Sequence, residues 1–225
     1  MAPEGPPSSA VADLVDRIER AAGAADGRYL LGIAGSPGGG KTTLAAAIVA
    51  ELNERRGGGA AALPMDGFHL ANASLDRLGR RDRKGALDTF DGWGFLALLE
   101  RVRRETGHTV YAPSFRREVD EGVAGEIAIE PSARIVVVEG NYLLVGDEPW
   151  AGVREALDEV WFCDTPADQR EARLVERHVR GGRSPQAALA WAREVDGVNA
   201  VMIEATRGRA DLIVSGASGR VFTAD

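Results

Sequence analysis

The feature that most constrains this chain is a glycine-rich loop, Gly35-Ser-Pro-Gly-Gly-Gly-Lys-Thr42, which fills every fixed position of the pattern G-x-x-x-x-G-K-[ST]. The apolar run 28–34 (RYLLGIA) before it predicts a buried strand, and residues 41–55 after it have helical composition. A glycine-rich turn that happens to precede a lysine is the alternative, but it does not require that strand and that helix. The sequence therefore predicts a phosphate-binding loop.

The chemistry of such a loop follows from its backbone. Glycines let successive N–H groups point into one concavity, and the following helix adds its unpaired N–H groups and the positive end of its dipole. Lys41 would lie against the β- and γ-phosphates, and the Thr42 hydroxyl would reach Mg²⁺. We therefore predict ATP and Mg²⁺ as cofactors. The predicted nucleotide-binding residues of the loop are Gly35, Ser36, Pro37, Gly38, Gly39, Gly40, Lys41, Thr42 and the adjacent Thr43.

Apolar runs alternate with helical patterns along the rest of the chain, which predicts an α/β fold. Several of the expected strands are apolar on every side, as in a parallel sheet covered on both faces. We expect a three-layer P-loop NTPase fold in a single domain, residues 1–225, with residues 1–9 frayed. The expected strands are 28–34, 60–65, 109–115, 126–129, 134–138, 160–163 and 211–214. The expected helices start at Ala10 and span 41–55, 88–105, 166–180 and 185–206.

Composition narrows the classes of partner. There are 27 basic and 34 acidic residues, a formal net charge of −7, so no overall field attracts nucleic acid. The apolar runs are too short to cross a bilayer, the N-terminus is not typical of a secretory signal, and the single cysteine, Cys163, cannot form an intrachain disulfide. We expect a soluble, cytoplasmic protein with a small-molecule substrate and without nucleic-acid or membrane partners. A homodimer is left open.

Two acidic residues follow apolar strands directly. Asp66 comes after the expected strand 60–65, and Glu139 after 134–138. Ligands of open parallel sheets lie beyond the carboxyl ends of the strands, so both carboxylates should reach the loop's crevice. We assign Asp66 as the candidate base and Glu139, with Thr42, as the candidate Mg²⁺ ligand. The alternative is that either acid only caps a turn.

A stripe of arginines marks a candidate lid. Arg170, Arg173, Arg177 and Arg180 share one side of the expected helix 166–180, and a Gly-Gly pair and Arg183 follow. A solvated basic face is the ordinary explanation for such a stripe. Beside a phosphate loop, segment 165–184 is better explained as a lid that closes over a triphosphate, with Arg173 neutralising charge on the transferring group.

Taken in order, these pieces resemble the group of P-loop kinases that contains uridine kinase, bacterial-type pantothenate kinase and phosphoribulokinase. The closest likeness is to its nucleoside/nucleotide-kinase or fructose-transport-system-kinase branch. The resemblance runs from about Leu30 to Val214. It rests on GSPGGGKTT (35–43), MDGFHL (65–70), RKGALDTFD (83–91), YAPSF (111–115), IVVVEGNYLL (135–144), TPADQREARLVERHVRGGR (165–183) and ADLIV (210–214).

This resemblance implies roles for individual residues. Lys41 and Thr42 would hold MgATP, Asp66 would activate the acceptor hydroxyl, and Glu139 would serve the metal. Arg170, Arg173 and Arg177 match the lid arginines. On the acceptor side, His69 and Tyr111 match positions that line the pocket beside Asp66, and Phe68 and Phe115, which lie within the shared motifs, are candidates for its wall. For His69 a hydrogen bond to nearby backbone is an alternative, and for the aromatics a place in the core.

The chain also departs from the group's pattern. Arg177 is followed by His178 where relatives commonly have an aspartate, and Phe115 is followed by Arg116 where many have an acid. The identity of the acceptor therefore cannot be carried over.

Two functions remain at this point. One is an ATP-dependent phosphotransferase acting on a hydroxyl of a nucleoside, sugar or pantothenate-like metabolite. The other is an ATP-hydrolysing switch that acts on a protein partner. A GTPase-type switch is disfavoured because no N-K-x-D string occurs.

Overall fold

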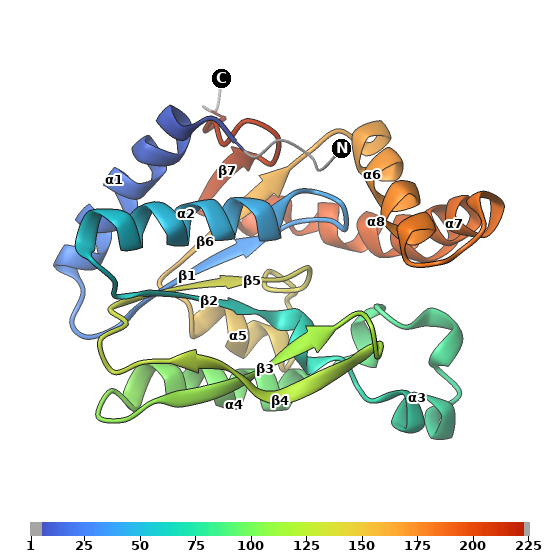
Figure 1. Ribbon diagram of the computed structural model, residues 1–225, viewed down its shortest axis with the longest axis horizontal. Coiled ribbons are helices and arrows are strands. Elements are labelled where there is room, and N and C mark those ends of the chain that lie inside the picture. The colour runs from blue at the N-terminus through green and yellow to red at the C-terminus, as the bar shows by residue number, and fades with distance from the viewer. Residues whose placement is uncertain (1–5, 223–225) are drawn as a thin grey trace.

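A computed structural model describes residues 6–222 of the chain, and residues 1–5 and 223–225 lie outside that description. Five parallel strands form its central sheet in the order β2-β5-β1-β6-β7 (Figure 1). The strand β1, which leads into the glycine-rich loop, is therefore central, between β5 and β6. The sheet strands are β1 Tyr29–Ala34, β2 Ala60–Pro64, β5 Ile135–Glu139, β6 Glu159–Asp164 and β7 Leu212–Ser215.

Helices cover both faces of the sheet, which confirms the predicted three-layer α/β architecture. Figure 1 shows α1 and α2 on one face and α4 and α5 on the other, while α6, α7 and α8 gather at one end. The helices are α1 Ser8–Ala24, α2 Lys41–Arg56, α3 Asn72–Leu78, α4 Gly92–Arg104, α5 Trp150–Glu155, α6 Ala167–Arg180, α7 Pro185–Trp191 and α8 Gly197–Ala205.

Each face of the sheet has its own apolar core, because alternate residues of the apolar strands point to opposite sides. Within β1, Leu31 and Ile33 pack against α1 and α2, whereas Leu30 packs on the side of α4 and α5. Strands that are buried on both sides explain the continuous apolar runs of the sequence.

Two aspartate side chains accept backbone hydrogen bonds near the starts of β1 and β6. The backbone N–H of Leu30 donates to Asp158 Oδ2 at 2.7 Å, and that of Val160 donates to Asp211 Oδ2 at 2.7 Å. Both acids thereby satisfy buried donors at the end of the sheet opposite the glycine-rich loop.

A separate antiparallel pair, β3 Val110–Arg116 and β4 Glu121–Ile129, lies beside α4 (Figure 1). The backbone of this hairpin packs closely against the turn that follows β2. A Cβ on Gly67 would lie 2.2 Å from the carbonyl oxygen of Pro113, so only glycine leaves room for the two backbones there. The hairpin is thereby held against residues 65–68.

Several expected boundaries were wrong. The expected helix 88–105 begins only at Gly92, because the Asp91 side chain caps it by accepting from Gly94 N at 2.8 Å. The expected helix 185–206, in contrast, is confirmed as a continuous helical segment over 185–205, in which α7 passes into α8 through a π-helical turn, Ala192–Asp196.

The N-terminal expectation needs correction as well. Ser8 and Ser9, placed in the frayed segment 1–9, belong to α1, and residues 1–5 of that segment lie outside the described residues. Strand β4 is longer than the expected 126–129, and α3 and α5 were not expected.

None of the helices between residues 6 and 222 is both long and apolar enough to span a bilayer.

The buried Arg28 gives a test of this packing. Its guanidinium donates to three carbonyl oxygens, of Val102 at the end of α4 (2.5 Å), Glu130 (3.0 Å) and Ala133 (2.7 Å). Arg28→Met removes all three donors, so we expect the free energy of unfolding, measured by urea denaturation, to fall by about 2–4 kcal/mol. Arg104→Met on the same helix is the control because its side chain is 70% exposed, and its effect should stay within about 0.5 kcal/mol. Equal losses in the two variants would contradict the structural role of Arg28.

Candidate active site

The glycine-rich loop connects the carboxyl end of β1 to the N-terminus of α2. Gly40 takes a left-handed conformation, with φ 95°, immediately before α2, and a Cβ there would lie 2.5 Å from the carbonyl oxygen of Gly216. Gly38, with φ 75°, is equally restricted, because a Cβ would lie 2.8 Å from the carbonyl oxygen of Arg170. The loop thus curls between the helix α6 and the segment after β7.

Lys41 is buried at the start of α2, and its ammonium group donates to the carbonyl oxygen of Ser36 across the loop at 3.1 Å. Burial lowers the pKa of Lys41, while the nearby carboxylates of Glu139 and Asp66 act against that shift. An anion bound in the concavity would likewise raise the pKa of Lys41.

The two predicted acids do converge on this loop. Glu139, at the end of β5, is aligned with Ile33 of β1 on one side and with Pro64 of β2 on the other. Asp66 lies two residues after Pro64, in a 3-10 turn, Met65–Phe68. The Thr42 hydroxyl donates to Glu139 Oε1 at 2.9 Å. Strand order therefore assembles Lys41, Thr42, Asp66 and Glu139 at one edge of the sheet.

Glu139 is buried, and its pKa is raised to about 7, first by burial and then by the charge of Asp66, while Lys41 lowers it. The residues at this edge fit Mg²⁺, which prefers oxygen ligands and takes many of them from phosphates. Within residues 6–222, no cluster of three or more His, Cys, Asp or Glu side chains forms a complete protein cage for a metal. A hydroxyl and two carboxylates beside a phosphate loop suit a metal that arrives with its nucleotide.

The arginines of α6 divide into two groups. Arg173 donates to the carbonyl oxygen of Gly38 at 3.2 Å, Arg170 pairs with Glu204 at 3.2 Å, and burial lowers the pKa of Arg177, with the positive charge of Arg117 adding to that shift. Arg180, in contrast, pairs with Glu176 on the exposed surface. Three of the four arginines thus lie toward the loop or are withdrawn from solvent.

The predicted acceptor-side residues form an aromatic cluster beside Asp66. The imidazole of His69 packs on Phe90 (centroids 4.0 Å apart) and Phe115 (4.6 Å), and its Nδ1 lies 2.7 Å from the carbonyl oxygen of Asp66. Burial lowers the pKa of His69. The backbone contact that we considered for His69 is therefore present together with its place beside the candidate base.

Other expected members of the acceptor side lie apart. Phe68 is half-buried and packs on Phe95 of α4 (5.1 Å), and Tyr111 is 60% exposed, four residues before Phe115 on β3. Thr43 is exposed on the first turn of α2. Cys163 is buried behind the loop, where its thiol lies 3.2 Å from the carbonyl oxygen of Gly39 and burial raises its pKa to about 12.

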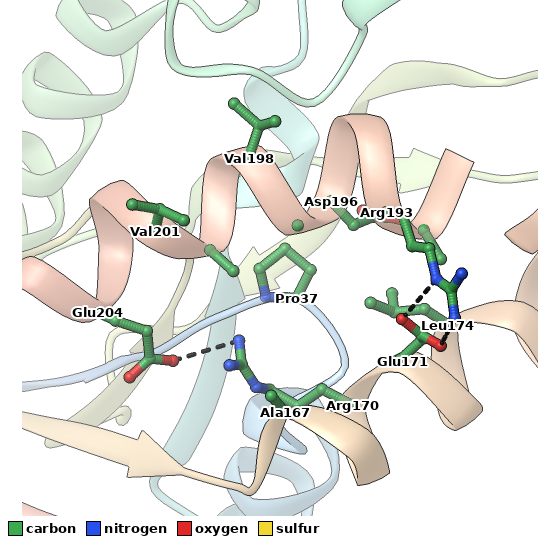
Figure 2. Close-up of a pocket in the computed structure, with 13 residues that line it drawn as sticks. Pro37, Ala167, Arg170, Glu171, Leu174, Arg193, Asp196, Val198, Val201 and Glu204 are labelled. Atoms are coloured by element: carbon green, nitrogen blue, oxygen red, sulfur yellow. Dashed lines mark hydrogen bonds and ion pairs between the residues drawn. The ribbon is translucent and has the colours of Figure 1, made fainter. Parts of the chain in front are cut away.

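Sequence reasoning missed residues that come from the segment after α6. Glu204 of α8 contacts Ser36 and Arg170, and Asp196 pairs with His178 of α6 at 2.7 Å. No local motif marks either acid, since each depends on a partner far away in the chain. A cavity of about 680 Å³ opens between α6 and α8, with Pro37 of the loop among its lining residues (Figure 2).

Comparison with known proteins agrees with this geometry. Residues 30–220 match the model of the Phosphoribulokinase / Uridine kinase family. The chain belongs to that family. It is therefore a P-loop kinase that uses ATP, and its substrate is a small molecule.

Individual relatives point the same way. A candidate uridine kinase of Schizosaccharomyces pombe is 32% identical over 194 residues, covering 83% of each chain. The ATP-dependent kinase-like protein notR' of Aspergillus versicolor is 40% identical over 133 residues, 56% of this chain and 77% of its own. The crystal structure of a candidate fructose transport system kinase from Silicibacter sp. TM1040 is 37% identical, with a TM-score of 0.82, over 90% of this chain and 98% of that one.

The close approach at Gly67 gives a test of the site's framework. Gly67→Ala forces the hairpin β3–β4 away from the turn that carries Asp66, so we expect loss of about 1–3 kcal/mol of stability and a displaced His69–Phe115 contact, visible by NMR. Gly107→Ala is the matched control, because a Cβ there meets nothing within 4 Å. An unperturbed His69–Phe115 contact in Gly67→Ala would contradict the packing described.

The carboxyl of Glu139 gives a second test. In metal-free protein we expect its pKa near 7 by carboxyl ¹³C NMR, and Asp66→Asn should lower it without restoring the ordinary 4.5, since burial is the larger cause. Because the folded-state pKa exceeds the unfolded one, the folded protein binds more protons, and the free energy of unfolding should fall as pH rises from 4.5 to about 7. Glu139→Gln should remove that part of the slope. A Glu139 titration at its ordinary value would contradict the burial argument.

Proposed function

We propose that the enzyme transfers the γ-phosphate of MgATP to a hydroxyl of a small metabolite, with Asp66 as the base. The observation that carries the proposal is the convergence of Lys41, Thr42, Glu139 and Asp66 at the carboxyl edge of the sheet. Family membership supports ATP-dependent transfer to a small molecule, and the residue roles below are our inference from geometry.

In this proposal the loop binds the triphosphate, Glu139 serves the metal ion, and Asp66 serves the acceptor hydroxyl. Thr42 and Glu139 would hold Mg²⁺, which would neutralise charge on the phosphates. The acceptor oxygen forms a bond to the γ-phosphorus, the bond from that phosphorus to the bridging oxygen breaks, and ADP leaves. Asp66 takes the proton of the acceptor hydroxyl.

The lid assignment is part of the same proposal. Segment 165–184 of the single kinase domain would close over the triphosphate and exclude water, with Arg170, Arg173 and Arg177 directed to the phosphates. The hydrogen bond from Arg173 to Gly38 supports this placement, because it already joins α6 to the loop.

The acceptor side is formed by Asp66, Phe68, His69 and Phe115, with Tyr111 farther along the hairpin. Rings that stack on one another beside a carboxylate suit a compact ligand with a flat or apolar face and one reactive hydroxyl. Nucleosides, sugars and pantothenate-like acids are the classes to test. An ADP-release assay against a panel of all three, with glycerate added, identifies the acceptor by the compound that stimulates turnover. ATP turnover that ignores every compound and responds to a protein partner would overturn the proposal in favour of a switch.

The role of Asp66 can be tested directly. Asp66→Asn keeps the side-chain volume but removes the base, so we expect phosphoryl transfer to fall by about 10²–10⁴ while the Kd for MgATP stays within about threefold. Asp82→Asn, an exposed acid in the segment between α3 and α4, is the control and should transfer phosphate normally. Transfer by Asp66→Asn within about tenfold of the wild type, 1.4 kcal/mol of barrier, would exclude Asp66 as the base.

A further inference from the structure

Glu204, on α8, is a carboxylate that touches both the phosphate loop and the lid helix. Its Oε1 accepts a hydrogen bond from the Ser36 hydroxyl at 2.5 Å and lies 3.2 Å from Nη1 of Arg170. Figure 2 shows Arg170 and Glu204 facing each other across the cavity between α6 and α8. One oxygen atom therefore joins three segments that are far apart in the sequence.

The loop side of this junction leads to the predicted phosphate ligand. Ser36 is fully buried, so its hydroxyl needs a partner inside the protein, and Glu204 is that partner. The carbonyl oxygen of Ser36 accepts one hydrogen bond from Lys41 Nζ at 3.1 Å and another from the backbone N–H of Gly39 at 3.0 Å. The orientation of Ser36 thus affects the position of the ammonium group and the curl of the loop.

The lid side of the junction depends on Glu204 as well. The Arg170 side chain is only 12% exposed, and its Nε is buried without a hydrogen-bond partner among the described residues. Glu171, the neighbouring acid on α6, pairs with Arg193 instead. Glu204 is therefore the carboxylate that orients the Arg170 guanidinium.

We propose that Glu204 is a positioning residue that sets the phosphate loop and the lid arginine in register for the triphosphate. The inference rests on the proposed function. Glu204 acts through Ser36 and Arg170, and a charge-assisted hydrogen bond to each is stronger than a neutral one and fixes its direction. Loss of the carboxylate leaves the Ser36 hydroxyl buried without an acceptor and releases Arg170.

The test measures the Kd for MgATP and for magnesium tripolyphosphate by calorimetry, which needs no knowledge of the acceptor. We expect Glu204→Ala to raise both Kd values about tenfold, because the contacts concern the phosphates and not the base. Glu204→Gln keeps an acceptor for Ser36 but loses the charge, so about threefold is expected. Glu194→Gln, an exposed acid on the preceding π-helical turn, is the matched control and should bind both probes as the wild type does.

A double-mutant cycle separates positioning from a general structural role. In a Ser36→Ala background, Glu204→Gln should raise the Kd by less than it does in the wild type, since one of its two partners is already gone. Additive effects in the cycle would overturn the inference. A lowered melting temperature with an unchanged Kd would overturn it too, because it shows a structural role alone.

The outcomes also separate this inference from the proposed function. If the wild type binds MgATP, Lys41→Ala abolishes binding and Glu204→Ala and Glu204→Gln match the control, the inference fails and the proposed function stands. If the wild type binds neither MgATP nor tripolyphosphate, the proposed function itself fails. Should Glu204→Ala not fold, Glu204→Gln carries the test with the same expected direction.

Discussion

The carbonyl group of Gly39, at the centre of the phosphate loop, anchors that loop to the ends of two neighbouring strands. Its oxygen accepts from the Thr165 hydroxyl at 2.8 Å and lies 3.2 Å from the thiol of Cys163, both just beyond or at the end of β6. A Cβ on Gly216 would lie 1.8 Å from the same oxygen. The loop can curl because the end of β6 supplies two side-chain donors to this oxygen, and because Gly216, just after β7, has no side chain to block it. The loop and the ends of β6 and β7 are therefore packed together as one unit.

The parallel sheet then decides which side chains can meet there. With β1 in the centre, the strand end that carries Glu139 lies on one side of the loop, and the end of β6, which leads into α6, lies on the other. Asp66 follows the next strand outward and is brought in by the 3-10 turn rather than by the strand itself. The acids thus face the loop from one side, and Arg170 and Arg173 of α6 lie on the other, which suits a ligand with charge to be neutralised along its length.

The sequence was informative wherever the signal was local. The glycine spacing and the apolar run before it predicted β1, the loop and α2, and acids directly after apolar strands predicted the edge of the sheet to which Asp66 and Glu139 belong. It failed where boundaries depend on a cap or on tertiary packing. Asp91 delays the start of α4 by accepting from Gly94, and the helix expected over 185–206 contains an unforeseen π-helical turn whose Asp196 binds His178 of α6. The contact of Glu204 with Ser36 spans 168 residues, so no local pattern could have marked it.

The charges of Lys41 and Glu139 act on each other's pKa. Burial pushes Lys41 toward its neutral form and Glu139 toward its protonated form, and each group's charge opposes the other's shift. A triphosphate placed in the loop favours the charged ammonium, and a divalent cation beside Thr42 favours the charged carboxylate. Nucleotide and metal would thus each stabilise the charged form of the group beside it. Under the proposed function a metal would enter this site together with the nucleotide, because residues 6–222 hold no cluster of three or more ligating side chains there.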